Sequence, residues 1–401
     1  MQKKKVYAVS TAHLDTVWRW DLRKTIEEYL PDTLRKNFDL IERYPDYCFN
    51  FEGAFRYQLI EEYYPLAFAE IQNLVKRGNW YPAGACYENG DVNIPSPEAL
   101  FRNILLGNRY FQEKFGVQSK DIFLPDCFGF GQALPSVMKY AGLLGFTTQK
   151  LSWGSAYGVP FTLGYWQGVD GSRVLACPNA RSYRSKFSGD LRGEVSVIDD
   201  VAKNAFEGGL PYAQHLYGTG DVGGAPTEES VQSVCASAAE NGQKDFDVIS
   251  AKSDQIFKDI DALPDSDKDR LPVWNNELLM TSHGAGGYTA RAMGKRLNRQ
   301  CEVLADVAES TLSTAELLGV YTYPQETVTK AWERLIQHQF HDDLPGTSNM
   351  DIYNTGWNDY HTSLVQLQGE YTGAVAAIAN QLDTQWVTDC ALIVHNPLPF
   401  A

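Results

Sequence analysis

Short apolar runs alternate with longer segments of helical periodicity over residues 6–274. Apolar residues are nearly continuous in runs such as 5–15 (KVYAVSTAHLD) and 121–131 (DIFLPDCFGFG), which predicts strands. Segments 31–46 and 65–80 instead repeat apolar residues at helical spacing, with proline and glycine at their ends. Because this alternation is typical of βα units, it predicts an α/β domain with a parallel sheet.

The last third of the chain changes to a continuous helical pattern. Segments 291–319, 327–340 and 363–383 carry apolar residues at helical spacing, and the last of them has a near-heptad stripe. Stripes of this kind pack helix against helix, so we expect a small antiparallel helical bundle. Residues 388–401 (TDCALIVHNPLPFA) then predict a lone strand that opens a further domain.

Composition and charge narrow the class of protein. The 401 residues are enough for two or three domains, and 44% apolar with 21% charged residues is ordinary for a globular chain. The formal net charge of −15 repels phosphates and anionic lipids, so we expect no nucleic acid and no membrane surface as a partner. No stretch approaches the roughly 20 apolar residues that span a bilayer.

The N-terminus and the cysteines predict a cytoplasmic protein. MQKKKVYAVS contains three lysines, but its apolar run passes directly into His13 and Asp15, unlike the apolar region of a signal peptide. The seven cysteines include no CxxC pair and their number is odd. This pattern indicates reduced, mostly buried thiols rather than a disulfide framework.

His13 and Asp15 form the first candidate site. They are two residues apart on a predicted strand, so their side chains point to the same face, at the C-terminal end where α/β folds place active sites. Imidazole and carboxylate are both ordinary zinc ligands, and the pair is half of a zinc site. A histidine with satisfied hydrogen bonds beside a helix-capping aspartate remains the alternative.

Two further aspartates lie in glycine-rich turns. Asp126 ends the run DIFLPD before Cys-Phe-Gly-Phe-Gly, where a carboxylate acts as a nucleophile, as a metal ligand, or as a plain turn residue. Asp221 lies in GTGDVGGAP, where the backbone can approach a ligand closely. It is a candidate general acid or a surface turn residue.

The remaining candidates come from the C-terminal half. His341, Asp342 and Asp343 end a predicted helix, and two aspartates there oppose the helix dipole unless something cationic, such as a metal ion, compensates them. His283 lies among glycines and is either a substrate contact or a structural loop residue. The other histidines have no partner at informative spacing, and neither GxSxG nor HExxH occurs.

Taken together, these segments resemble glycoside hydrolase family 38, the zinc-dependent retaining α-mannosidases. AHLDTVWRW is similar to the family's first-strand His-x-Asp motif, FLPDCFGFGQALP to its nucleophile segment, and QFHDDLPGTS to its late His-Asp motif. NGDVNIPSPEALFRNIL and NNELLMTSHGAGGYTAR are also similar to family segments. The resemblance runs from about Val6 to Asn396.

The resemblance implies a role for each matched residue. It implies one Zn²⁺ per chain, or another divalent metal, and an α-mannoside oligosaccharide as substrate. The implied residues are His13, Asp15, Asp126 and His341 as zinc ligands, Asp126 also as nucleophile, Asp221 as general acid/base, Trp18 as a sugar-stacking floor, and Asp342 as a contact to substrate hydroxyls.

We therefore expect an α/β fold with a seven-stranded β/α barrel-like catalytic domain over residues 1–290 and a helical bundle over 291–388. Residues 389–401 would begin a β-rich domain that family members carry and this chain does not. A homo-oligomer is compatible with the sequence. Two rival functions stay open: a metal-dependent carbohydrate hydrolase such as a deacetylase, and a truncated, inactive sugar-binding remnant.

Overall fold

The strand that carries the His-x-Asp motif, β1 (Lys4–Ala12), has parallel neighbours on both sides in the computed structural model, which describes residues 2–397. On one side it pairs with β9 (Tyr212–Thr219) along almost its whole length. On the other side β10 (Phe246–Ser250) pairs with its first half and β2 (Phe49–Glu52) with Ser10 and Thr11, and β3 (Trp80–Ala83) extends the sheet beyond β2. Every residue from Val6 to Ala12 is buried, as a strand covered on both faces requires.

A second sheet has five strands and mixed direction. Its order is β11-β7-β8-β6-β4, and only the β7–β8 pair is antiparallel. A two-stranded antiparallel ribbon of β5 and β12 lies apart from both sheets. The strands are β4 (Asp121–Phe123), β5 (Gly129–Phe130), β6 (Gly145–Thr147), β7 (Gly164–Gln167), β8 (Arg173–Cys177), β11 (Val273–Trp274) and β12 (Leu278–Leu279).

The two large sheets meet at two seams. Ala85 N–H donates to Asp121 C=O (2.8 Å) just after β3, and Leu216 N–H of β9 donates to Ala180 C=O (2.7 Å) just after β8. These isolated bonds do not make a continuous ladder; at the first seam β3 ends at Ala83 and Gly84 turns the chain with φ +70°. The α/β prediction is confirmed, whereas the seven-stranded β/α barrel-like arrangement is not, because most of the strands lie in two separate five-stranded sheets.

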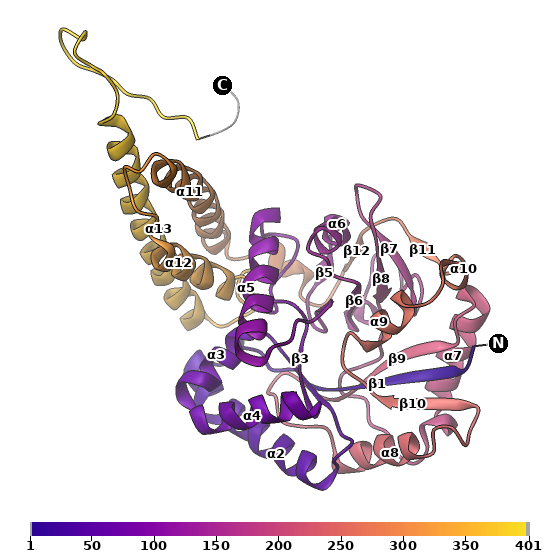
Figure 1. Ribbon diagram of the computed structural model, residues 1–401. Helices are drawn as coiled ribbons and strands as arrows, with labels where there is room; N and C mark the ends of the chain where they lie inside the picture. The colour runs from indigo at the N-terminus through magenta and orange to yellow at the C-terminus, as the bar shows by residue number, and fades with distance from the viewer. Residues whose placement is uncertain (1, 398–401) are drawn as a thin grey trace.

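Helices surround the two sheets (Figure 1). The segment predicted helical from Pro31 has that proline in its first turn, and the segment from Pro65 ends at Gly78, whose φ of +86° closes the helix. The helices of this part are α1 (Leu22–Lys24), α2 (Leu30–Arg43), α3 (Ala54–Tyr63), α4 (Pro65–Arg77), α5 (Pro97–Phe115), α6 (Ala133–Tyr140), α7 (Val195–Gly208), α8 (Glu228–Ala239), α9 (Gln255–Asp261) and α10 (Asp265–Lys268). A π-helical turn (Thr25–Tyr29) and short 3₁₀ turns (Lys150–Trp153, Leu191–Gly193, Ala285–Thr289) complete it.

Three long helices, α11 (Ala292–Leu317), α12 (Gln325–Gln337) and α13 (Met350–Ala379), pack together and project from the α/β part at the upper left of Figure 1. Gln339, just after α12, bonds to Asn298 near the start of α11 (2.9 Å), so these two helices run antiparallel. Arg334 of α12 bonds to Gln366 of α13 (2.8 Å), while His338 bonds to Asp359 (2.9 Å), so α12 and α13 are antiparallel too.

Two C-terminal predictions differ from the structure. Helix α13 begins at Met350 rather than near residue 363, because Asn349 caps it and Gly356 lets it pack closely on His338. Residues 388–397 form no strand, and Leu392 and Val394 are 88% and 84% exposed, since no neighbouring strand pairs with them. The rest of the predicted strand segment, residues 398–401, lies outside the described residues.

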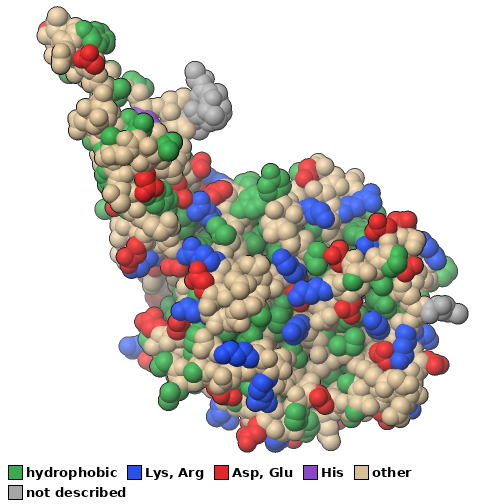
Figure 2. All heavy atoms as spheres, viewed as in Figure 1, with side chains coloured by type: hydrophobic (Ala, Val, Ile, Leu, Met, Phe, Trp, Pro, Cys, Tyr) green, Lys and Arg blue, Asp and Glu red, His purple; other side chains and the backbone are tan. Residues whose placement is uncertain are grey.

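Surface and cysteine chemistry match the composition. Acidic and basic side chains are interspersed over the α/β part on the face shown in Figure 2. All seven cysteines are free thiols and five of them are buried, as expected for reduced, mostly buried cysteines. No helix within residues 2–397 is long and apolar enough to cross a membrane.

Asp121, at the start of β4, makes the stability of the fold depend on pH. Burial, followed by the negative charge of Asp254, raises the pKa of Asp121 to about 7. The folded chain therefore keeps a proton that the unfolded chain releases near pH 4, so this contribution to stability is complete below about pH 4 and is lost as the pH rises through 7. Asp121→Asn should abolish that loss. Urea unfolding of both proteins across this range tests it, and a constant stability difference contradicts it.

Candidate metal centre and active site

The polar residues of the site follow the C-terminal ends of parallel strands, as active-site residues do in barrel and doubly wound folds. His13 and Asp15 come directly after β1, Asp126 follows β4, and Asp221 follows β9. His341 reaches the same place from the loop between α12 and α13. The fold thus brings together residues more than 300 positions apart.

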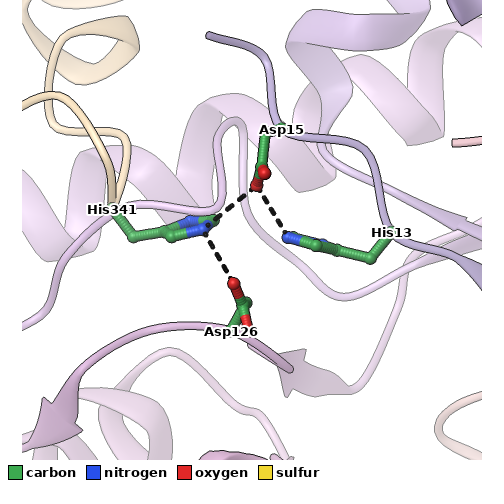
Figure 3. Close-up of side chains that lie close together, drawn as sticks. All are labelled: His13, Asp15, Asp126 and His341. Atoms are coloured by element: carbon green, nitrogen blue, oxygen red, sulfur yellow. Dashed lines mark hydrogen bonds and ion pairs between the residues drawn. The ribbon is translucent and has the colours of Figure 1, made fainter. Parts of the chain in front are cut away.

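His13, Asp15, Asp126 and His341 each offer one ligand atom to a common point, and these atoms all lie within 4.8 Å of one another. Figure 3 shows the four side chains converging. Asp15 Oδ1 is 3.0 Å from His13 Nε2 and 3.4 Å from His341 Nε2, and His341 Nε2 is 3.8 Å from Asp126 Oδ2. All four side chains are buried or nearly so.

Hydrogen bonds at Nδ1 fix the orientation of both imidazole rings. His13 Nδ1 donates to Glu52 Oε1 (2.6 Å), and His341 Nδ1 donates to the Asn89 carbonyl (2.9 Å). Both Nε2 atoms therefore face the cluster, which is the arrangement of histidines that bind metals. His341 Nε2 is buried without a hydrogen-bond partner. Two nitrogens and two carboxylates, with that orphaned nitrogen among them, fit a divalent metal such as zinc.

The pKa shifts reflect the crowding of buried carboxylates around the two histidines. Burial disfavours a charged His13, but hydrogen bonds with Asp15 and Glu52 outweigh burial and raise its pKa to about 10. Burial would also raise the pKa of Asp15, yet its hydrogen bond with His13 and the positive charges of His13 and His341 hold that pKa well below the usual range. Burial and then the charge of Asp15 raise the pKa of Asp342 to about 7. The histidines thus supply positive charge that a metal ion would otherwise bring.

A second pair of carboxylates shares one hydroxyl. Tyr183 O–H lies 3.2 Å from Asp126 Oδ1 and 3.0 Å from Asp221 Oδ1. Lys150 forms an ion pair with Asp126, and Arg184 forms one with Asp221. Asp221 has a φ of +71°, a strained conformation for a non-glycine residue that persists where the surroundings enforce it. Asp126 belongs both to this pair and to the metal cluster.

The remaining sequence-predicted residues line a cavity of about 300 Å³ above the cluster. Trp18 and His283 line it, and so does Asp342, which accepts a bond from Thr347 Oγ1 at 2.5 Å. Asp343 lies outside it and pairs with His338 (2.7 Å), so a histidine rather than a metal compensates it. Further lining residues are Asp15, Asp126, Phe128, Lys150, Trp153, Tyr183, Arg184, Asp221, Gly284 and Thr347.

Sequence reasoning missed several polar residues of this site, among them Glu52, Lys150, Tyr183 and Arg184. Glu52 is the last residue of β2, and Lys150 begins the 3₁₀ turn three residues after β6 ends, so both lie at the C-terminal end of a strand, as Asp126 does. Their position beside short apolar runs is a signal that could have found them. Tyr183 lies in an irregular segment after β8 with no periodic pattern. Nothing in its sequence context indicates that it bridges two carboxylates.

Comparison with known proteins identifies the family. The model "Glycosyl hydrolases family 38 N-terminal domain" matches residues 3–277, and "Alpha mannosidase middle domain" matches residues 283–378. The chain is therefore placed among the glycosyl hydrolases. It belongs to glycosyl hydrolase family 38.

Named relatives agree with this assignment. The chain is 31% identical to human Alpha-mannosidase 2C1 over 85% of its own length and 32% of the relative's. It is 31% identical to Alpha-mannosidase G of Dictyostelium discoideum over 94% of its length and 34% of the relative's. An α-mannosidase structure from Enterococcus faecalis V583 matches with a TM-score of 0.78 at 21% identity, covering 95% of this chain and 43% of that one. The chain thus spans about a third of the length of these curated relatives.

Replacing the two histidines tests the metal centre. His13→Ala combined with His341→Ala removes both nitrogen ligands, and we expect the variant to lose bound metal after incubation with zinc and desalting, as measured by elemental analysis. His361→Ala, an exposed histidine on α13, is the matched control and should keep the wild-type content. Full zinc retention in the double variant would refute the ligand set.

Proposed function

We propose that this chain carries the catalytic site of a zinc-dependent, retaining α-mannosidase that hydrolyses terminal α-mannosides of oligosaccharides or glycans. One observation carries the proposal: Asp126 belongs both to a four-residue metal cluster and to a carboxylate pair bridged by Tyr183. Family membership and the α-mannosidase names of the relatives support the choice of substrate.

The spacing of the carboxylates supports retention of configuration. Because one hydroxyl oxygen bonds Asp126 Oδ1 at 3.2 Å and Asp221 Oδ1 at 3.0 Å, these two oxygens are at most about 6 Å apart. Retaining glycosidases place their two carboxyl groups about 5–5.5 Å apart, whereas inverting enzymes need about 6.5–9.5 Å to admit a water. This upper bound lies below the inverting range and so supports a retaining mechanism.

The proposed reaction has two steps. Asp126 attacks the anomeric carbon while Asp221 donates its proton to the glycosidic oxygen, so a carbon–oxygen bond to Asp126 forms as the bond to the leaving group breaks. Water then attacks the same carbon and gives a proton to Asp221, and Asp126 leaves as a carboxylate. A zinc ion held by His13, Asp15, Asp126 and His341 would supply electrostatic stabilisation and a fixed template for the substrate.

Other residues of the cavity fit the binding of a sugar. Trp18 offers an aromatic face, on which the CH groups of a pyranose pack, and Asp342 offers a carboxylate to the hydroxyls. His283 closes another wall, where its ring lies 4.6 Å from that of Trp153. We propose these three residues as substrate contacts.

The proposal extends to organisation and location. We place the catalytic domain at residues 1–290 and the helical domain at 291–388, which the adjoining matches ending at residue 277 and beginning at residue 283 support. The free, mostly buried cysteines support a reducing, cytoplasmic location.

Asp126→Asn tests the nucleophile. An amide cannot form the ester link to the sugar, so turnover of an aryl α-mannoside should fall by about 10⁴-fold or more. Far-UV circular dichroism and zinc analysis of the variant show whether the fold and the metal survive. The wild-type protein should form a covalent adduct on Asp126 with a 2-fluoro mannoside, detected by peptide mass spectrometry.

Substantial activity in Asp126→Asn would overturn this assignment. Zinc binding with turnover but no adduct would favour the deacetylase-like rival, in which water is the nucleophile. Zinc binding with no turnover of any mannoside would favour the sugar-binding remnant.

Asp221→Ala tests the general acid. Loss of proton donation should lower kcat by about 10²–10⁴-fold for a disaccharide, whose leaving group needs a proton. For a dinitrophenyl mannoside, whose leaving group needs no proton, the rate of the first step, cleavage of the glycosidic bond, should fall far less. Steady-state and burst kinetics on the two substrates measure the difference, and an equal loss on both would exclude Asp221 from this role.

A further inference from the structure

A fully buried ion pair lies directly behind the metal cluster. Arg56, on α3, and Glu88, in the segment between β3 and α5, are both 0% exposed, and Arg56 Nη1 donates to Glu88 Oε1 at 3.0 Å. Neither side chain lines the cavity or belongs to the ligand set. The proposed reaction therefore gives neither of them a direct part.

Arg56 contacts the chain beside three of the ligands. Its Nε donates to the carbonyl of Leu14, the residue between His13 and Asp15 (2.9 Å). Its Nη1 also donates to the carbonyl of Glu52 (3.3 Å), whose carboxylate fixes the His13 ring. Its guanidinium lies 5.8 Å from the ring centre of Phe340, the residue before His341.

Glu88 extends the network to the remaining side of the cluster. Its Oε2 accepts from the Thr16 hydroxyl (2.8 Å), next to Asp15, and its Oε1 accepts from the Asn89 N–H (2.7 Å). The Asn89 carbonyl in turn accepts both the Nδ1–H (2.9 Å) and the backbone N–H (3.2 Å) of His341. The ion pair thus joins the segment carrying His13 and Asp15 to the segment holding His341.

The backbone around Arg56 is shaped to admit its guanidinium. A Cβ at position 53 would lie 2.1 Å from Arg56 Nη1, and Gly53 has a φ of +83° that side chains rarely adopt. Removing two charges from water is costly, so a buried ion pair is a poor way to gain stability compared with apolar packing. Apolar residues, however, could not make the directional hydrogen bonds that the Arg56–Glu88 pair makes.

We infer that the Arg56–Glu88 pair is a positioning device that sets His13, Asp15 and His341 relative to one another and so tunes the affinity of the site for its divalent cation. The inference rests on the proposed metal site. It differs from a purely stabilising role in one measurable respect, because it predicts a change in zinc affinity in a chain that is still folded.

Arg56→Lys keeps the positive charge but removes the planar fork that bonds Leu14, Glu52 and Glu88 together. We expect the zinc dissociation constant of the full chain to rise about 10- to 100-fold, as for other partners that orient metal ligands. Competition with a chromophoric zinc chelator measures it, and circular dichroism of the metal-free proteins verifies the fold. Glu88→Gln, which keeps the shape of the side chain and removes its charge, should also raise the zinc dissociation constant. If Arg56→Lys does not fold, Glu88→Gln takes its place in the test.

Tyr57→Phe is the matched control. Tyr57 follows Arg56 on α3 and is equally buried. Its hydroxyl donates to the Phe51 carbonyl (2.9 Å) and accepts from Trp80 Nε1 (2.8 Å), and the substitution removes both hydrogen bonds. It should lower the melting temperature without changing the zinc affinity. Equal zinc affinity in the wild type, Arg56→Lys and Glu88→Gln would overturn the inference and leave the pair a structural element.

Mannoside turnover is measured in parallel. Zinc binding without turnover refutes the proposed function alone, whereas a wild type that binds no zinc refutes both the proposed function and this inference.

Discussion

Carboxylates removed from water need positive charge close by, and this requirement governs the centre of the molecule. Asp15, Glu52, Asp126 and Asp342 are all at least nine-tenths buried within one small region. Leaving such groups unpaired costs several kcal/mol each. Lys150 and the histidines meet part of the need: Lys150 pairs with Asp126, and hydrogen bonds with Asp15 and Glu52 raise the pKa of His13 to about 10 although burial opposes it. A divalent cation would meet it more completely and return both histidines to their neutral, ligating form.

The fold satisfies this requirement through the ends of its parallel strands. Strands β1 and β9 run parallel in one sheet and β4 belongs to the other, and the residues that follow these strands converge although they are far apart in sequence. The helices α11–α13 add His341 through the loop that follows α12, and His338 anchors this loop between Asp343 and Asp359. The helical part is therefore a component of the site and not an appendage to the α/β part.

Much of this could be predicted from sequence because the signals were local. The two-residue spacing of His13 and Asp15, the Asp126 that ends an apolar run, and the proline and glycine at the ends of helices all act within a few residues. The split into two sheets could not be predicted, since it depends on where single backbone bonds replace a ladder, as at Ala85. Tyr183 and the Arg56–Glu88 pair were equally inaccessible, because their roles arise from contacts between distant segments.

The strand expected near the C-terminus shows the limit of local patterns. Residues 391–394 have the apolar character of a strand, yet in the structure no neighbour pairs with them and they stay exposed. A strand needs a partner as well as a suitable sequence. By contrast, α13 extends well before its apolar stripe, because capping by Asn349 and packing on His338 outweigh the weak helix propensity of its first turns.

Anomalous diffraction at the zinc absorption edge, from a crystal of the zinc-loaded chain, would show whether these four residues bind the metal. We expect a single strong peak at about 2.0–2.2 Å from His13 Nε2, His341 Nε2 and one oxygen each of Asp15 and Asp126. A peak held by other residues, or no peak among these four while the crystal contains zinc elsewhere, would contradict this expectation.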